Sequence, residues 1–160
     1  MGRDHWYFAY GSNLSVDQKA RRTGHVREVI RCRLPGFRLA FNKRSVDGTI
    51  KANVVEDASR EVWGVAYRCD EAAMAAMDRS EGAGYRRRAV QVIIGSGRRL
   101  DAVTYVATRI GPEGAPHDDY LRLILGGAEH HRLPKSYIRD IERLARLTGS
   151  RDGSPPRDTP

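Results

Sequence analysis

Six or seven short strand-like segments follow one another along this chain of 160 residues, and most are separated by turn residues. Phe37, Leu39 and Phe41 show the pattern at its clearest, because they occupy alternate positions, the period of a half-buried strand. The other segments are short apolar, aromatic or β-branched runs. The expected strands cover residues 6–10, 26–33, 37–42, 50–55, 61–69, 85–94 and 100–108.

Turn residues between these segments predict how the strands connect. Pro35-Gly36, Asp47-Gly48 and Gly95-Ser96-Gly97 are typical turn sequences. A further hairpin is expected between residues 50–55 and 61–69, with residues 56–60 as its turn. Within the second of these strands, Trp63-Gly64 indicates a place where another backbone or a ligand comes close, since glycine leaves that space open.

Helical patterns cover residues 15–22, 71–79 and 117–131, and a last helix begins near Pro134, a favourable first-turn residue. Strands joined by hairpin-like turns, with helices inserted early, in the middle and at the end, indicate an α+β fold. A small, mainly antiparallel β-barrel or curled sheet with helices packed outside fits this pattern. Residues 148–160 consist of glycine, serine, proline and charged residues, which predicts a disordered tail after a single domain over residues 1–147.

Composition excludes several classes of protein. With 40% hydrophobic and 30% charged residues, the chain is typical of a globular protein. No apolar run approaches the ~20 residues that span a bilayer, and no signal-peptide pattern opens the chain, so no membrane association and a cytoplasmic location are expected. Cys32 and Cys69 lie in strand-like runs and are predicted to be buried free thiols. The adjacent His130 and His131 point in different directions on a helix, so no metal site is predicted.

The formal net charge of +8 raises the question of nucleic-acid binding. The arginines are spread thinly, as in Arg21-Arg22, Arg86-Arg87-Arg88 and Arg98-Arg99, and no nucleic-acid motif accompanies them. Basic charge alone supports only nonspecific attraction. A solvated surface that favours anionic substrates is therefore the preferred interpretation, and nucleic acid is not an expected partner.

The segment Tyr7-Phe8-Ala9-Tyr10-Gly11-Ser12-Asn13-Leu14 predicts a buried strand that ends in a tight turn before a helix. Ser15 and Gln18 have the spacing of a capping box at the start of that helix. Backbone N–H groups and the helix dipole at such a turn favour a carboxylate or an oxyanion. An ordinary strand-to-helix turn fits the local pattern equally well.

Glu81 is the most interesting acid in the sequence. It follows a predicted helix, in a loop with Gly82 and Gly84, and precedes Tyr85. A carboxyl in a partly dry cleft has a raised pKa and acts as a general base, whereas a solvated loop glutamate is the commoner case. Asp78 is a rival acid, with a surface charge or a helix-end cap as its alternative. Because the sequence contains no triad, P-loop, zinc or dinucleotide motif, acid–base chemistry without a cofactor is the simplest class of enzyme for it.

Four segments, in order, resemble the gamma-glutamylcyclotransferase family over about residues 6–145. They are YFAYGSNL at residues 7–14, EVWGV at residues 61–65, MDRSEG at residues 77–82 with Tyr85 after it, and residues 116–134, which include PHDDY and Gly126 to Pro134. The resemblance implies a small β-barrel flanked by helices, with a cleft at the turn of residues 11–13. It also implies an intramolecular aminolysis that converts a gamma-glutamyl amide into 5-oxoproline and a free amino acid or amine.

The resemblance assigns roles to particular residues. Glu81 falls on the family's general acid–base glutamate, and Tyr120 falls on a substrate-contacting tyrosine. Tyr85 is also expected to contact the substrate. The substrate-binding turn comprises Tyr7, Phe8, Ala9, Tyr10, Gly11, Ser12 and Asn13. The expected partner is a small gamma-glutamyl substrate, no metal or cofactor is expected, and a homodimer is left open, as is the identity of the leaving group. A noncatalytic binding module of the same fold, with a basic surface for anionic partners, is the alternative.

Overall fold

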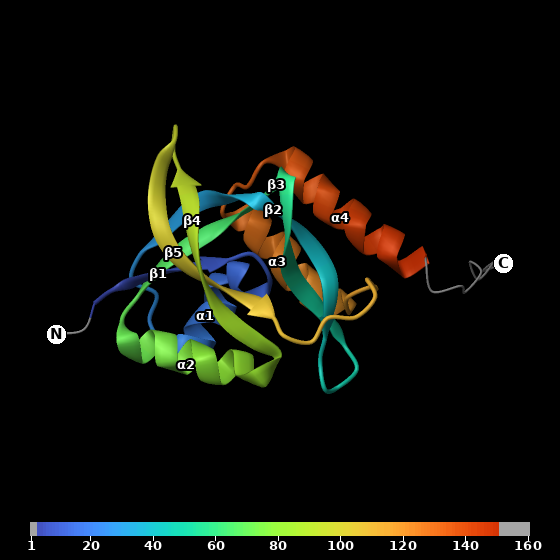
Figure 1. Cartoon of the computed structure of the whole chain (residues 1–160), viewed down its shortest axis with the longest axis horizontal. Helices are drawn as coiled ribbons and strands as arrows, with labels where there is room; N and C mark the ends of the chain where they lie inside the picture. Colours follow the sequence, from blue (N-terminus) through green and yellow to red (C-terminus); the bar gives the residue numbers. More distant parts are fainter. Residues whose placement is uncertain (1–2, 151–160) are drawn as a thin grey trace.

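Five strands form a closed barrel in the computed structural model, which describes residues 3–150 and the side chains of residues 3–146 (Figure 1). The strands are β1 (His5–Ala9), β2 (Val29–Arg44), β3 (Ile50–Cys69), β4 (Tyr85–Ile94) and β5 (Arg98–Ala107), arranged in the order β1-β3-β2-β4-β5. All neighbouring pairs are antiparallel except β1 and β5, which close the barrel in parallel where Tyr7 pairs with Val103. The α+β class and the mainly antiparallel, mixed barrel are thus confirmed.

Helices pack around this barrel. They are α1 (Val16–Thr23), α2 (Glu71–Glu81), α3 (Asp118–His130) and α4 (Lys135–Ser150), and two short 3-10 helices, η1 (Ser12–Leu14) and η2 (Gly82–Gly84), lie before α1 and after α2. Figure 1 shows α2 along one side of the barrel and α4 on the other, and α1 contacts α2 while α3 contacts both η1 and α4. No helix within residues 3–150 is both long and apolar enough to cross a membrane.

The two long strands β2 and β3 correct two predictions. Residues 26–33 and 37–42 are not separate strands, and residues 50–55 and 61–69 do not pair as a hairpin. Instead, β2 and β3 pair with each other along most of their length and are joined by the turn that contains Asp47-Gly48. The turn signals at Pro35-Gly36 and at residues 56–60 mark a shared irregularity in the pairing, because Pro35 lies opposite Glu61 whereas Phe37 lies opposite Glu56.

The misleading signal at residues 56–60 has a physical basis. The Asp57 carboxylate accepts hydrogen bonds from the Ser59 N–H, at 3.1 Å, and from the Ser59 hydroxyl, at 2.7 Å. This is the local pattern of a turn. In this barrel the turn bends a continuous strand, as bulges do, and does not reverse the chain.

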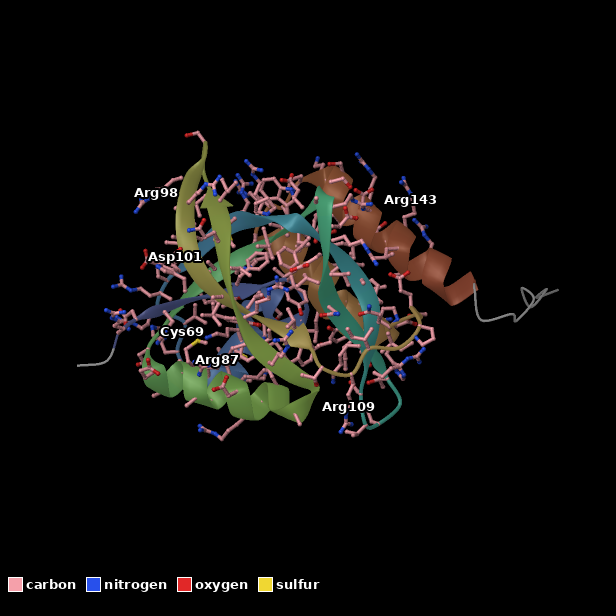
Figure 2. All side chains as sticks on the ribbon, viewed as in Figure 1. Cys69, Arg87, Arg98, Asp101, Arg109 and Arg143 are labelled. Carbon is pink, nitrogen blue, oxygen red and sulfur yellow. The ribbon has the colours of Figure 1, made fainter. Side chains whose placement is uncertain are left out.

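The core lies inside the barrel and beneath the helices. Gly64 on β3 confirms the predicted close approach, because a Cβ atom there would lie 2.2 Å from the Ala9 carbonyl oxygen. Cys32 and Cys69 are buried free thiols, as predicted. Charged side chains such as Arg98 and Asp101 on β5 and Arg143 on α4 are exposed and lie on the outside of the molecule (Figure 2). The α4 helix continues to Ser150, within the segment predicted as a tail, and the rest of that segment lies outside the described residues.

Candidate active site

A cavity of about 210 Å³ opens where β1, η1 and the end of α2 meet the β2–β3 hairpin. Its lining combines several tyrosines with one carboxylate and three cationic side chains. The lining residues are Tyr7, Tyr10, Gly11, Ser12, Asn13, Arg22, Lys43, Ser45, Lys51, Ala52, Ser80, Glu81, Tyr85, Tyr105 and Tyr120. No group of three or more His, Cys, Asp and Glu side chains suited to a metal ion occurs in the described part of the chain.

The strand-to-helix turn adopts a tighter form than the sequence predicts. Residues 12–14 form η1, in which the Leu14 N–H bonds the Gly11 carbonyl oxygen at 3.0 Å, and α1 begins only after Ser15. The Ser15 hydroxyl accepts the Gln18 N–H at 3.3 Å, so the predicted cap on α1 is present. Residues 11–13 line the cavity, and the first N–H groups of a short helix have no partner within it.

Asn13 connects the turn to the rest of the site. Its buried side-chain amide donates to the Tyr7 hydroxyl at 3.0 Å and to Glu81 Oε1 at 3.4 Å, and its amide oxygen accepts from Arg22 Nη1 at 3.0 Å. The Tyr67 hydroxyl fixes the backbone of Asn13 through a 2.6 Å bond to its carbonyl oxygen. With both ends of its amide bonded, Asn13 keeps Glu81 and Arg22 next to each other. We call Asn13, Arg22 and Glu81 the acid cluster.

Glu81 is the last residue of α2 and does not lie in a loop as predicted. Gly82 follows with φ of 62°, and its N–H bonds the Asp78 carbonyl oxygen, which ends the helix. The Glu81 side chain is only 13% exposed and lies 3.7 Å from Arg22 Nη1. Burial raises the pKa of the Glu81 carboxyl, and the positive charges of Arg22 and Lys43 only partly oppose this increase. A carboxyl with a raised pKa is better suited to accept and return a proton than an ordinary exposed glutamate is.

Asp78, the rival acid, already accepts hydrogen bonds from two other side chains. Its carboxylate receives two hydrogen bonds from Arg87, at 2.7 and 2.6 Å, and one from the Tyr105 hydroxyl at 2.5 Å. The Arg87 guanidinium is the main reason why the pKa of Asp78 is lowered. A carboxylate that is paired in this way and has a lowered pKa is a poor general base, so Asp78 positions Tyr105 and β4.

Tyr85 and Tyr120 meet at Ala52, on β3. The Tyr85 hydroxyl donates to the Ala52 carbonyl oxygen at 2.7 Å, and the Tyr120 hydroxyl accepts from the Ala52 N–H at 2.9 Å. The structure therefore brings together side chains that lie 35 positions apart in the sequence. The Tyr120 hydroxyl also lies close to Gly11, where a Cβ atom would be only 3.2 Å away from it.

Lys43 and Lys51, which we call the lysine pair, line the cavity from the β2–β3 hairpin. Lys43 is buried, its Nζ donates to the Ser45 hydroxyl at 3.0 Å, and it lies 4.9 Å from the centre of the Tyr85 ring. Lys51 Nζ lies 4.3 Å from the centre of the Tyr120 ring. A Cβ atom on Gly84 would be 2.7 Å from Lys43 Nζ, so the glycine after α2 leaves room for this lysine.

Most of the predicted site residues line this one cavity, whereas Phe8 and Ala9 do not. Both are fully buried in the core, and the Phe8 ring packs against the ring of Tyr10. Sequence reasoning missed seven lining residues, which are Arg22, Lys43, Ser45, Lys51, Ala52, Ser80 and Tyr105. Only Arg22 carried a usable signal, since it lies two turns into the helix that follows the turn.

Comparison with known proteins agrees with this geometry. The model of the family described as "Gamma-glutamyl cyclotransferase, AIG2-like" matches residues 7–125. The chain is 27% identical to a gamma-glutamylcyclotransferase of Mus musculus over 153 residues, which cover 89% of this chain and 80% of that protein. The Homo sapiens gamma-glutamylcyclotransferase is 28% identical over 147 residues, covering 86% and 77%. A solved gamma-glutamyl cyclotransferase structure superposes with a TM-score of 0.81 at 26% identity, covering 88% of this chain and 87% of its own. The chain therefore belongs to the gamma-glutamyl cyclotransferase, AIG2-like family.

Proposed function

We propose that this protein is a gamma-glutamylcyclotransferase, which releases 5-oxoproline and an amino acid or amine from a gamma-glutamyl amide. The observation that carries the proposal is the buried Glu81 carboxyl, with its raised pKa, in the same cavity as the turn of residues 11–13. The names of the relatives support the same reaction. A cavity of about 210 Å³ suits a gamma-glutamyl group better than a macromolecule.

The reaction needs proton transfer and a folded substrate. The ionised Glu81 removes a proton from the substrate's α-ammonium group, and the free amine then attacks the γ-carbonyl carbon. A new C–N bond closes the five-membered ring. Glu81 returns the proton to the leaving nitrogen, and the original amide C–N bond breaks. The ring nitrogen then loses its second proton to the departing amine, so that a neutral lactam N–H and an ammonium product form. General acid–base catalysis of this kind contributes about 100- to 10,000-fold in rate.

The remaining rate enhancement comes from binding. Because the amine and the carbonyl belong to one molecule, holding them in contact contributes up to roughly 7–11 kcal/mol. The N–H groups of Ser12 and Asn13 are suited to stabilise the oxygen that becomes negatively charged on the γ-carbonyl carbon. The rings of Tyr85 and Tyr120 form the wall against which the substrate chain folds.

The decisive experiment measures 5-oxoproline released from a panel of gamma-glutamyl dipeptides and amines. Wild-type protein is expected to turn over at least one of them, and Glu81→Gln is expected to lower kcat by about 100- to 10,000-fold, with an unchanged circular dichroism spectrum. Glu129→Gln, an exposed glutamate on α3, is the matched control and keeps full activity. Full turnover by the Glu81 variant would overturn the role of this residue.

A noncatalytic binding module of the same fold is the alternative, and the net charge of +8 is the observation that favours it. No turnover across the whole panel, together with steep salt-dependent binding of an anionic polymer such as heparin, would support this alternative. The cytoplasmic location and the absence of nucleic-acid binding stay predictions from the sequence, and the oligomeric state stays open.

A further inference from the structure

Lys43 and Lys51 face each other directly across the β2–β3 hairpin. They are Cα partners in the antiparallel pairing, and both line the cavity. Like charges at directly opposed positions destabilise a sheet. The nearby Lys51 charge indeed contributes, after burial, to the lowered pKa of Lys43. This arrangement weakens the hairpin and places both ammonium groups at the cavity. An anion bound between them would offset their repulsion.

The protein itself supplies little negative charge to the lysine pair. Within the described side chains, neither ammonium group forms an ion pair with a carboxylate, and the negative charges that act on Lys43 are those of Glu81 and Asp47. Glu81 is already paired with Arg22. The Asp47 carboxylate accepts hydrogen bonds from the N–H and hydroxyl of Thr49, at 2.9 and 2.6 Å. Arg109 adds a further positive charge near Lys43.

The charges in the cavity therefore do not cancel. Three cationic side chains, Arg22, Lys43 and Lys51, face one carboxylate, Glu81. A gamma-glutamyl group carries one α-carboxylate and one α-ammonium group, so it brings no net charge. When Glu81 takes the ammonium proton, the acid cluster contacts the gamma-glutamyl end of the substrate, where the reaction occurs. The lysine pair then remains for the part of the substrate beyond the scissile amide.

The position of the lysine pair supports this division. The ammonium groups lie over the faces of Tyr85 and Tyr120, and both of these tyrosines are fixed to the Ala52 backbone. The ring faces hold the two charges on the hairpin wall. Asn13 and Arg22, in contrast, hold Glu81 from η1 and α1, although the Lys43 charge still acts on the pKa of Glu81.

We propose that Lys43 and Lys51 form a subsite for carboxylates of the leaving group, and that this subsite determines substrate specificity. The inference rests on the proposed function and deepens it. Gamma-glutamyl amino acids are preferred over gamma-glutamyl amines, and a leaving amino acid with two carboxylates, such as glutamate, is preferred over one with a single carboxylate. Leaving groups with an additional positive charge are disfavoured, because they face two ammonium groups.

The test compares kcat/KM for three substrates: gamma-glutamyl-glutamate, gamma-glutamyl-alanine and gamma-glutamyl-ethylamide. Wild-type protein is expected to rank them in that order. In Lys51→Met, the ratio of the first to the last is expected to fall about tenfold, the worth of one hydrogen bond to a charged group. Lys135→Met, an exposed lysine at the start of α4, is the matched control and leaves the ratio unchanged.

Two outcomes would overturn the inference. Equal losses on all three substrates would mean that the lysine pair holds the α-carboxylate of the gamma-glutamyl group. An unchanged ratio in both Lys51→Met and Lys43→Met would mean that the leaving group lies elsewhere. Either result requires turnover, so neither is confused with failure of the proposed function, which would appear as no 5-oxoproline from any substrate.

A binding measurement gives a second readout that does not depend on catalysis. Calorimetry on Glu81→Gln is expected to show about tenfold tighter binding of gamma-glutamyl-glutamate than of gamma-glutamyl-ethylamide at low salt. The difference should shrink as salt is added and disappear when Lys51→Met is combined with Glu81→Gln. Equal affinities for the two ligands in Glu81→Gln would contradict the proposed subsite.

Discussion

Glu81 illustrates how a single residue combines charge and burial. Two cations act on its carboxyl, yet burial is the larger influence and the pKa is raised. The Asn13 amide and the Arg22 guanidinium hold the carboxyl at the cavity wall, but the carboxyl can still exchange a proton. The distances to these two groups, 3.4 and 3.7 Å, are long for a hydrogen bond and for an ion pair. Such loosely held carboxyls accept a proton more easily than a tightly paired one such as Asp78.

The raised pKa of Glu81 predicts a stability effect with a definite sign. At low pH the carboxyl is protonated in both the folded and the unfolded chain, and its ionisation does not lower the free energy of unfolding. As the pH rises through the folded-state pKa, the buried group must ionise, and stability is lost relative to a chain that has no carboxyl there. Glu81→Gln is therefore expected to melt at a higher temperature than wild type at about pH 7, and the difference should vanish near pH 4. Thermal unfolding at both pH values checks this, and a less stable variant at neutral pH would contradict it.

Arg22 predicts a shift in the pH profile of turnover. Its positive charge is the largest influence that lowers the pKa of Glu81. Arg22→Met should therefore move the acidic limb of the kcat/KM profile to higher pH, because more alkaline solution is needed to ionise Glu81. The neighbouring Arg21 is exposed on the same helix, and Arg21→Met should leave the limb in place. An acidic limb at the same pH in both variants would exclude Glu81 as the titrating group.

At the scale of elements, α3 supports the site through one glycine. A Cβ atom on Gly127 would lie 2.5 Å from the Leu14 carbonyl carbon and 2.6 Å from its Cβ, so α3 rests directly on the end of η1. The next glycine toward the N-terminus, Gly126, has nothing within 4 Å of such an atom. Close packing therefore requires a glycine at position 127 but leaves room for a side chain at position 126.

This contrast predicts opposite effects of the same substitution. Gly126→Ala should stabilise the protein by about 0.5–1 kcal/mol, because alanine is the better helix former and the space is free. Gly127→Ala should destabilise it by more than about 2 kcal/mol and reduce turnover, because α3 has to move away from η1. Chemical denaturation and 5-oxoproline release measure the two effects. Equal changes in both variants would contradict the proposed support of η1 by α3.

The elements also show what the sequence can and cannot predict. The strands β1, β4 and β5, the turn at Asp47-Gly48 and the start of α1 after Ser15 follow from local patterns, and the structure contains them to within one or two residues. The continuity of β2 and β3 does not follow, because Pro35-Gly36 and the Asp57–Ser59 turn look locally like chain reversals. Only the long-range pairing of β2 with β3 shows that these two segments bend the strands and do not reverse the chain.

At the scale of the whole molecule, the cavity is assembled from segments far apart in the chain. Tyr7 and Asn13 come from its beginning, Lys51 and Glu81 from its middle and Tyr120 from its last third. The resemblance of the sequence to a known family predicted Glu81 and every tyrosine of the cavity except Tyr105. It did not predict the lysine pair, because two lysines in polar hairpin positions look like solvated surface charges until the barrel places them in a cavity.

A site built in this way predicts that ligand binding stabilises the entire fold. A slowly reacting gamma-glutamyl ligand on Glu81→Gln contacts β1, the β2–β3 hairpin and α2 at once. At a concentration about 100 times its dissociation constant, it should add about 2.7 kcal/mol to the free energy of unfolding. A rise in melting temperature with ligand concentration checks this, with free glycine at the same concentration as the control. No rise at any ligand concentration would mean that the folded protein does not bind the ligand.

The β2–β3 hairpin has a consequence for how such proteins diversify. The acid cluster lies on η1, α1 and α2, whereas Lys43 and Lys51 lie on one short ribbon whose tip is a simple turn. If the proposed subsite holds, substitutions of Lys51 should alter which molecules are accepted, whereas substitutions of Lys43 should also raise the pKa of Glu81. Proteins with this barrel can therefore change their substrate specificity through a few substitutions in one hairpin. Directed evolution of specificity should begin by randomising the same short segment.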